Sequence, residues 1–227
     1  MSNKELLTFL TELSANNSKE WMDENRKWYE QERTSFLEIV AEILAALSKI
    51  ELGFSELRPK DCMFRQNRDI RFSANKAPYK TNMAAYFSIG GKKAEGPGYY
   101  LHVQPGASMV GGGVWMPQAP VLKKIRQEID YSGQELNQIL SAPEIKGTFG
   151  AMQGEKLKTS PKGFEKDHPY IEYLRYKSFV LSRPVSDKDI HSGAYVGLAL
   201  EAYEKMRPFQ TFLARAIYTT DEEDLLL

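Results

Sequence analysis

The middle of the sequence contains short runs of β-forming residues, most of them bounded by glycine or proline. The runs are Cys62–Arg65, Asp69–Ser73, Met83–Ile89, Tyr99–Gln104 and Ser108–Trp115. The connections contain Gly90-Gly91, Gly96-Pro97-Gly98 and Pro105-Gly106. Short connections of this kind join neighbouring antiparallel strands, whereas parallel strands need a crossover of a dozen or more residues. The sequence therefore predicts a largely antiparallel sheet of consecutive strands, with one more strand at Ser178–Arg183.

Apolar residues at helical spacing flank this β region on both sides. Before it we expect a leucine-rich helix, then helical structure over residues 18–50 with Ser18 as N-cap, in one piece or two. The helices expected after it are Ala119–Asp130, Ser132–Ser141 with Ser132 and Glu135 as a capping box, a short helix opened by Asp167, and Gly193–Ile217, which Pro208 kinks or divides near Arg207. The predicted fold is α+β, with N-terminal helices and with helices, including a long C-terminal one, packed on one side of the sheet.

The 227 residues suit a single domain. We expect one α+β domain over residues 1–218, helical to residue 57, mainly β over 58–116 and mixed over 117–218. Residues 219–227 form an acidic tail that we expect to be flexible. With Cys62 as the single cysteine, no intrachain disulfide can form. The sequence shows neither a secretory signal nor an apolar run long enough to span a bilayer, so we expect a cytoplasmic protein without membrane contact.

Charge is unevenly distributed along a chain whose formal net charge is zero. Residues 1–57 carry 6 Lys/Arg against 11 Asp/Glu, whereas residues 58–80 carry 7 Lys/Arg against 2 Asp. A neutral chain with one basic segment favours a local anion site over a broad nucleic-acid surface, which usually brings a basic domain. The alternative is that the acidic helices simply pair with the basic segment.

The segment from Arg65 to Lys80 is the leading candidate for a functional site. If Asp69–Ser73 is extended, Ile70 and Phe72 face the core, and alternate residues face outward. Clustered guanidinium and ammonium groups bind phosphate or carboxylate, and Asp69 would orient one arginine. The ligand-binding residues expected in this segment are Arg65, Arg68, Arg71, Ser73, Lys76, Tyr79 and Lys80. The alternative is an edge strand that its charges keep soluble.

Further candidate residues lie outside this segment. Tyr100 and His102 share one face of a predicted strand, where His102 either titrates near neutrality or is a partly buried structural residue. The candidate catalytic proton carriers are Asp69 and His102. The remaining expected ligand-binding residues are Tyr100, Trp115, Lys162 and His168. The three histidines lack the spacing of metal ligands, so we expect no metal, and no cofactor motif is present.

Motifs spread along the chain resemble those of one protein family. They include Asp69-Ile-Arg-Phe-Ser73 with Lys76 and Pro78-Tyr79-Lys80, Gly98-Tyr99-Tyr100 with His102, Pro161-Lys162-Gly163, Asp167-His168-Pro169 and Lys177-Ser178-Phe179. Together they are similar to the domain of unknown function 2461 family of microbial proteins, over about residues 5 to 217. The resemblance implies one conserved unit and no particular chemistry.

These observations predict an anion-binding site for a phosphorylated or carboxylated small molecule. Whether the protein is an enzyme is left open, as is its oligomeric state. The alternatives are a nucleic-acid-binding module, in which the same cations contact phosphates, and a protein-interaction module that uses the acidic helices or tail.

Overall fold

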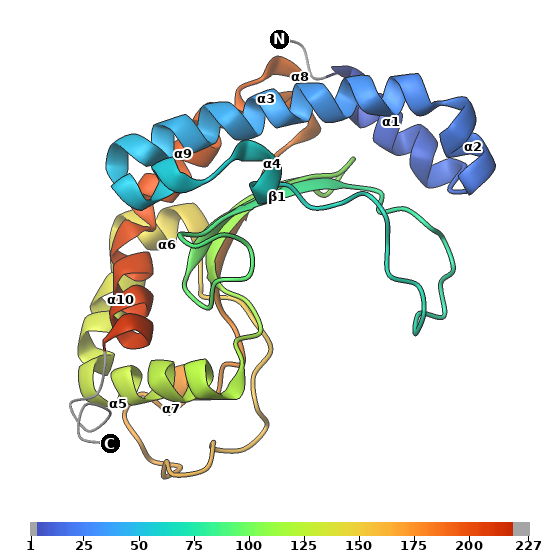
Figure 1. Ribbon diagram of the computed structural model, residues 1–227. Coiled ribbons are helices and arrows are strands. Elements are labelled where there is room, and N and C mark those ends of the chain that lie inside the picture. Colours follow the sequence, from blue (N-terminus) through green and yellow to red (C-terminus); the bar gives the residue numbers. More distant parts are fainter. Residues whose placement is uncertain (1–3, 220–227) are drawn as a thin grey trace. The chain divides into compact units, whose positions relative to one another are not determined.

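The computed structural model describes residues 4–219 of the chain (Figure 1). It contains one four-stranded antiparallel sheet whose strands lie side by side in chain order. The strands are β1 (Met83–Phe87), β2 (Gly98–Val103), β3 (Met109–Val114) and β4 (Phe179–Pro184). The predicted sheet of consecutive strands is confirmed, and so is the α+β class.

The described chain forms two compact units. The first takes residues 4–92, 100–110 and 184–201, and the second takes residues 93–99, 111–183 and 202–219. Each unit includes part of the sheet, because the boundaries fall within β2, β3 and β4. The single domain expected over residues 1–218 stays a prediction.

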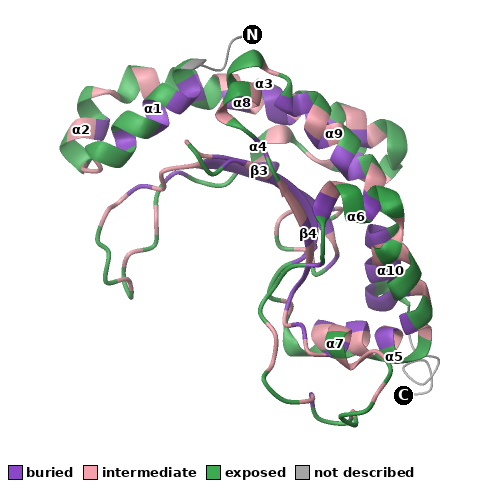
Figure 2. Cartoon of the chain, turned by 180° about the vertical axis from the view of Figure 1, so that it is seen from behind, coloured by how far each residue is buried: buried purple, intermediate pink, exposed green. Residues whose placement is uncertain are grey.

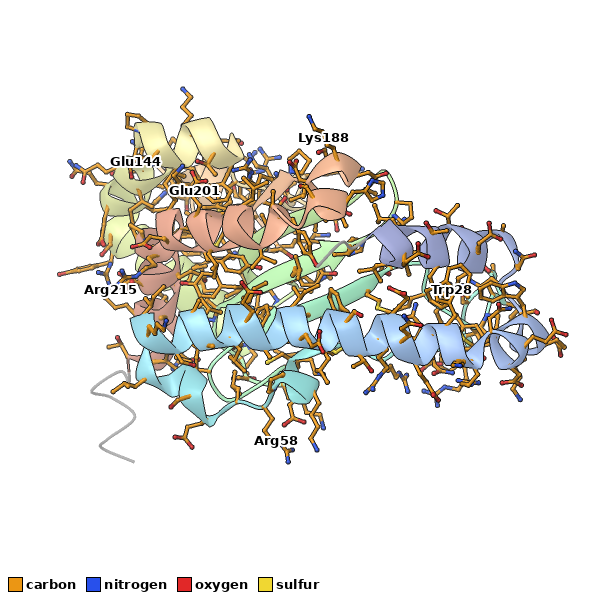
Figure 3. All side chains as sticks on the ribbon, turned by 90° about the horizontal axis from the view of Figure 1, so that it is seen from above. Trp28, Arg58, Glu144, Lys188, Glu201 and Arg215 are labelled. Carbon is orange, nitrogen blue, oxygen red and sulfur yellow. The ribbon has the colours of Figure 1, made fainter. Side chains whose placement is uncertain are left out.

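Helices of the first unit pack around the long helix α3. They are α1 (Lys4–Ala15), α2 (Lys19–Glu24), α3 (Arg26–Ile50), the 3₁₀-helix η1 (Leu52–Glu56), α4 (Pro59–Cys62) and α8 (Asp187–Ser192). The Ser18 hydroxyl accepts a hydrogen bond from Trp21 N at 3.1 Å, which confirms the expected N-cap. Residues 18–50 form two helices that meet at Asn25. Trp28, labelled in Figure 3, meets the buried ring of Phe9 edge-on at 5.3 Å between centroids.

The second unit contains α5 (Ala119–Ser141), α6 (Pro143–Phe149), α7 (Ile171–Leu174) and α10 (Arg207–Tyr218). The two helices expected over 119–141 meet at a kink at Ser132, where the backbone is non-helical (φ −118°, ψ 27°), and together they make up α5. Glu135 does not complete a capping box there; its carboxylate binds Arg215 of α10 at 2.6 Å. Helix α9 (Tyr195–Lys205) ends just before α10, so the predicted division near Pro208 is confirmed.

Strand β3 lies unusually close to its neighbours because it contains glycines, which have no side chain. A Cβ on Gly112 would lie 2.6 Å from Gln210 Nε2, and the same amide donates to Gly98 O at 2.8 Å. Gly113 has φ +122°, and its Cβ would lie 2.1 Å from Phe179 O of β4. The glycines therefore let β3 approach β4 and the helix above it closely.

Two expected strands before β1 are wrong. Residues 59–62 form α4, and Cys62–Arg65 contributes a single antiparallel bridge, Met63 to Ala85. Asp69–Ser73 contains a turn at residues 71–72. Phe72, expected in the core, is 97% exposed and Ile70 is half-buried. Alternation of polar and apolar residues indicates a strand only where one face is buried, and here neither face is.

The short helix expected at Asp167 begins later in the chain, and the expected acidic tail lies largely beyond the described residues. Asp167 does not cap a helix, since α7 begins at Ile171 and its N-cap position is Tyr170. The acidic residues Asp221, Glu222, Glu223 and Asp224 lie outside the described residues. Within residues 4–219, no helix has the length and apolar character needed to cross a bilayer.

Candidate anion-binding site

The segment from Phe64 to Ala84 forms an irregular two-armed ribbon in the first unit. Its arms are joined by three backbone hydrogen bonds: Phe64 N to Ala84 O at 2.9 Å, Arg68 N to Pro78 O at 2.9 Å, and Lys80 N to Gln66 O at 2.8 Å. Figure 1 shows the resulting teal loop extending from α4 and β1, and its tip is coloured as exposed in Figure 2. The basic residues of the segment therefore lie on a ribbon with a fixed base and an exposed tip.

Two amide side chains hold the arm that carries Lys80. The Asn17 side chain accepts from Tyr79 N at 3.0 Å and donates to Tyr79 O at 3.0 Å. Gln66 is 6% exposed, and its amide donates to Lys80 O and, at 3.2 Å, to Asn82 O. A buried amide without hydrogen-bond partners destabilises the folded protein, so breaking these bonds is costly. The bonds therefore hold the backbone of Tyr79 and Lys80 in place.

The cations near the tip form hydrogen bonds and an ion pair with other groups of the ribbon. The Arg71 guanidinium donates twice to the Asp69 carboxylate, at 3.0 and 2.7 Å, so Asp69 orients an arginine as expected. Arg68 donates to Ala77 O at 3.0 Å and to Ser73 Oγ at 3.4 Å. Lys76 Nζ donates to Ile70 O at 3.1 Å. Because Asp69 already pairs with Arg71, and Arg68 and Lys76 are held by oxygens of the ribbon, the tip is a poorer place for a bound anion than the base.

The base of the ribbon differs, because two ammonium groups share one aromatic ring there. Lys80 Nζ lies 5.2 Å and Lys92 Nζ 5.5 Å from the centroid of Phe64. Lys92 also donates to Met63 O. Arg65 is exposed, and its charge lowers the pKa of Lys80. Within residues 4–219, none of these three cations has a carboxylate within 4.0 Å.

Lys80 also lines a polar pocket of about 230 Å³ in the first unit. The residues that line it are Asn17, Arg68, Asn75, Ala77, Tyr79, Lys80, Thr81 and Asn82. Most of these side chains are neutral amide or hydroxyl groups, and the two charged ones are both cations. Neutral donors around a cation suit the oxygens of a small anion.

A row of hydrogen bonds on β2 lies beside Phe64. The Tyr100 ring meets the Phe64 ring edge-on at 6.3 Å. Gln104 Oε1 lies 2.9 Å from His102 Nε2, so with that oxygen accepting, Nε2 carries the proton. Nδ1 is then the acceptor, and Tyr100 O–H donates to it at 2.9 Å. Asn82, which also lines the pocket, lies 3.5 Å from the same nitrogen.

Burial shapes the protonation of this site. It lowers the pKa of Lys80, and the charges of Arg65 and Lys92 act in the same direction. It also lowers the pKa of His102, against the opposing effect of the hydrogen bond to Gln104. His102 is therefore a neutral imidazole at neutral pH. The hydrogen bonds from Arg71 lower the pKa of Asp69, which makes its carboxylate a weak proton acceptor.

The other expected site residues lie in the second unit. Trp115 is 70% exposed and Lys162 is exposed. His168 Nε2 donates to Asp130 at 2.9 Å while its Nδ1 accepts from Tyr170 N at 3.1 Å. Both nitrogens of His168 therefore have partners within the unit, as a structural histidine would.

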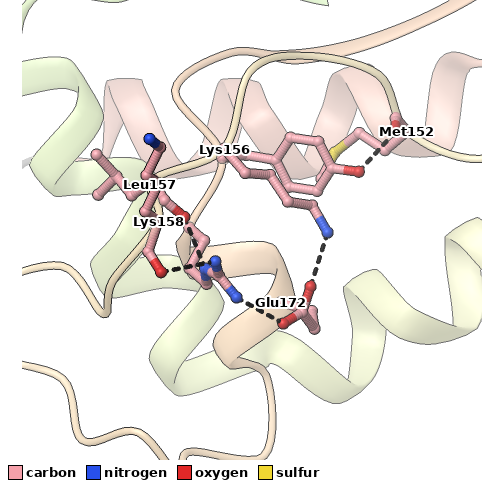
Figure 4. A network of polar contacts seen from close by, with 7 residues as sticks. Met152, Lys156, Leu157, Lys158 and Glu172 are labelled. Atoms are coloured by element: carbon pink, nitrogen blue, oxygen red, sulfur yellow. Dashed lines mark hydrogen bonds and ion pairs between the residues drawn. The ribbon is translucent and has the colours of Figure 1, made fainter.

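Basic residues near Lys162 are tied into a network of their own (Figure 4). Glu172 binds Lys156 at 2.8 Å and Arg175 at 3.2 Å. Arg175 also donates to the carbonyls of Leu157 and Lys158, at 2.8 and 2.9 Å. Both cations of this cluster share the carboxylate of Glu172, unlike those at the base of the ribbon.

Several residues of the site were not expected from the sequence. Phe64 and Lys92 lie 28 positions apart and meet only through the fold. Asn17 lies between α1 and α2, and its contact with Tyr79 spans 62 positions. Nothing in a single sequence distinguishes Gln66 and Asn82 as site residues, because amide side chains are also common on ordinary protein surfaces. Within residues 4–219, no three His, Cys, Asp or Glu side chains gather as a metal site would need.

Comparison with known protein families gives one match. The model of the family described as conserved hypothetical protein (DUF2461) matches residues 5–212. The chain belongs to this family. The matched residues include the whole ribbon, Lys92 and the Tyr100–Gln104 row of this DUF2461 protein, and the resemblance expected from its motifs is confirmed. Searches of curated proteins and of solved structures found no match.

Proposed function

We propose that the protein binds a small phosphorylated or carboxylated molecule at the base of the ribbon, through Arg65, Lys80 and Lys92. One observation carries the proposal: Lys80 and Lys92 share the ring of Phe64, the charge of Arg65 acts on Lys80, and none of the three has a carboxylate partner within residues 4–219. Gathering like charges in a partly buried place costs free energy. A bound anion offsets that cost.

Neutral side chains of the pocket beside Lys80 would give the site its selectivity for one small molecule over another. The pocket beside Lys80 presents amide and hydroxyl groups from Asn17, Asn82 and Thr81. Its volume of about 230 Å³ suits a small molecule rather than a folded partner. The cations bind the phosphate or carboxylate group, and the neutral side chains contact the rest of the molecule.

The exposed ring of Phe72 favours a second candidate function, the binding of single-stranded nucleic acid. Phe72 is 97% exposed, and Arg71 lies 5.8 Å from its centroid, an arrangement on which a base can stack. The neutral chain argues against a long nucleic-acid surface. Sensitivity to salt separates the two functions.

The test is titration calorimetry of the full chain with inorganic phosphate and with a panel of phosphorylated and carboxylated metabolites, at constant ionic strength. Arg65→Gln and Lys92→Gln should each weaken binding by about tenfold, the usual effect of losing one charge-assisted hydrogen bond. The matched controls are Arg58→Gln and Lys60→Gln. Both residues are exposed, and Arg58 is already paired with Asp61 at 2.6 Å.

Two results would contradict the proposal. One is that no anion of the panel binds more tightly than chloride. The other is that the control variants weaken binding as much as Arg65→Gln. If an unstructured oligonucleotide binds instead, and its affinity falls steeply between low and moderate salt, the nucleic-acid function takes precedence.

A further inference from the structure

Lys80 is the half-buried cation of the ribbon whose charged group has no hydrogen-bond acceptor within residues 4–219; Arg65 also lacks one, but it is exposed. Lys80 Nζ lies over the face of Phe64. Arg68, Arg71, Lys76 and Lys92 each donate to a carbonyl, hydroxyl or carboxylate. An ammonium ion has three donors, so a half-buried one without acceptors is poorly stabilised in its charged form.

Burial and neighbouring charges lower the pKa of Lys80, while the ring face of Phe64 acts in the opposite direction by attracting the ammonium charge. Burial is the largest effect, and the nearby charges of Arg65 and Lys92 add to it. The backbone of Lys80 is held by Gln66, and that of the neighbouring Tyr79 by Asn17. The lowered pKa raises the fraction of Lys80 present as free amine, and this lysine lies on a fixed backbone beside other cations and lines a pocket. These are features of a nucleophilic lysine.

We propose that Lys80 forms a reversible imine with a small carbonyl compound that also carries a carboxylate or phosphate group. The inference rests on the proposed function: as an ammonium ion Lys80 helps Arg65 and Lys92 to bind the anionic group, and in its deprotonated fraction the same side chain meets the carbonyl carbon. The substrate class is that of 2-oxo acids and of phosphorylated aldehydes or ketones. The pocket of about 230 Å³ accommodates molecules of this size.

The step is balanced with the groups present. The lysine ammonium first releases a proton to solvent, and the amine nitrogen bonds to the carbonyl carbon. The carbonyl oxygen takes up protons and leaves as water, so that an ammonium ion and a carbonyl become a protonated imine and one water molecule. Hydrolysis reverses the step. The protonated imine withdraws electrons from the adjacent carbon, which is the reactivity that imine-forming enzymes use.

The experiment uses pyridoxal 5′-phosphate as the probe, because it combines an aldehyde with a phosphate. The full chain is incubated with it at neutral pH and reduced with borohydride, and the labelled lysines are located by peptide mass mapping. We expect Lys80 to be labelled at least about tenfold faster than the exposed Lys60 and Lys49. Inorganic phosphate should slow the labelling of Lys80, and pyridoxal without its phosphate should label it more slowly.

The variant Lys80→Arg keeps the positive charge and removes the amine. It should retain phosphate binding in calorimetry and lose the specific label. If phosphate binds and Arg65→Gln weakens it, yet Lys80 is labelled no faster than Lys60, the imine inference is overturned and the anion site stands. If Lys80 is labelled rapidly and phosphate neither binds nor protects it, the amine is reactive but the anionic substrate class is wrong.

Discussion

Phe72 shows how a single residue can depart from the rule that large apolar side chains are buried. It is 97% exposed at the tip of the ribbon, next to the Asp69–Arg71 ion pair. The tip is ordered without it, through the hydrogen bonds of Arg68 and Lys76 and the bond from Ser73 N to Ile70 O. An exposed aromatic ring on an ordered loop contributes little to folding and is available for contacts with other molecules.

The first prediction concerns this residue. Phe72→Ser should leave the melting temperature within about 2 °C of wild type, because the ring buries almost no surface. The matched control is Phe87→Ser on β1, where the ring is fully buried; it should unfold the protein or lower its melting temperature by more than 10 °C, about the effect of losing several kcal/mol. Differential scanning calorimetry measures both. A large loss in Phe72→Ser would mean that the ring packs against the protein after all.

For single residues, the sequence could point to a basic segment but not to the state of each side chain. The crowding of cations between Arg65 and Lys80 singled out this ribbon as the candidate site, which stays a prediction. It could not separate Arg71, which Asp69 neutralises, from Arg65, for which no partner is found within residues 4–219. That distinction depends on side-chain directions within a turn. Lys92 was missed because it approaches Phe64 from another segment of the chain.

At the scale of secondary structure, β3 and β4 show what the glycine run contributes. Gly112 leaves room for the Gln210 amide of helix α10, and Gly113 leaves room for the Phe179 carbonyl of strand β4. Gly113 also has φ +122°, a backbone conformation that side-chain-bearing residues rarely adopt. A single methyl group at either position must therefore move the backbone.

The second prediction is that Gly113→Ala destabilises the protein by about 2–4 kcal/mol, through both the clash and the backbone conformation. Gly147→Ala in α6 is the matched control. No atom lies within 4 Å of its added Cβ, and the position is helical, so alanine should be neutral or stabilise by up to about 1 kcal/mol. Chemical denaturation with urea measures both variants. Equal effects of the two changes would show that β3 can shift to accept a side chain.

The helices and strands were largely predictable because their signals are local. Ser18 caps α2 through a hydroxyl three residues from its partner, and Pro208 ends α9 through its own ring. The two strands expected before β1 are wrong because alternating polar and apolar residues predict a strand only if other parts of the protein bury one of its faces, and the sequence does not show whether they do. Glu135 failed as a cap for a related reason: Arg215, 80 positions away, offers its carboxylate a stronger partner than a backbone amide.

At the scale of the whole molecule, the pH dependence of stability reports on His102. The imidazole is neutral and half-buried, with Tyr100, Gln104 and Asn82 as its contacts, none of which is a carboxylate. Burial lowers its pKa in the folded state below the value of about 6.5 in the unfolded chain. The unfolded state therefore binds more protons as the pH falls below about 6.5, and the folded state loses stability over that range. Above that pH both states are neutral at His102 and its contribution is constant.

The third prediction follows from this linkage. Between pH 7.5 and 5.5 the wild-type melting temperature should fall more than that of His102→Gln, which keeps a hydrogen-bonding side chain and removes the titrating group. His191→Gln, at an exposed position on α8, is the matched control and should fall as wild type does. The comparison uses slopes, so any loss that His102→Gln causes at pH 7.5 does not affect it. If His102→Gln and wild type fall in parallel, the imidazole is protonated as readily in the folded protein as in the unfolded chain. The hydrogen-bonded row from Tyr100 to Gln104 would then accept a charge, and Nδ1 of His102 could not be the neutral acceptor assigned to it beside the anion site.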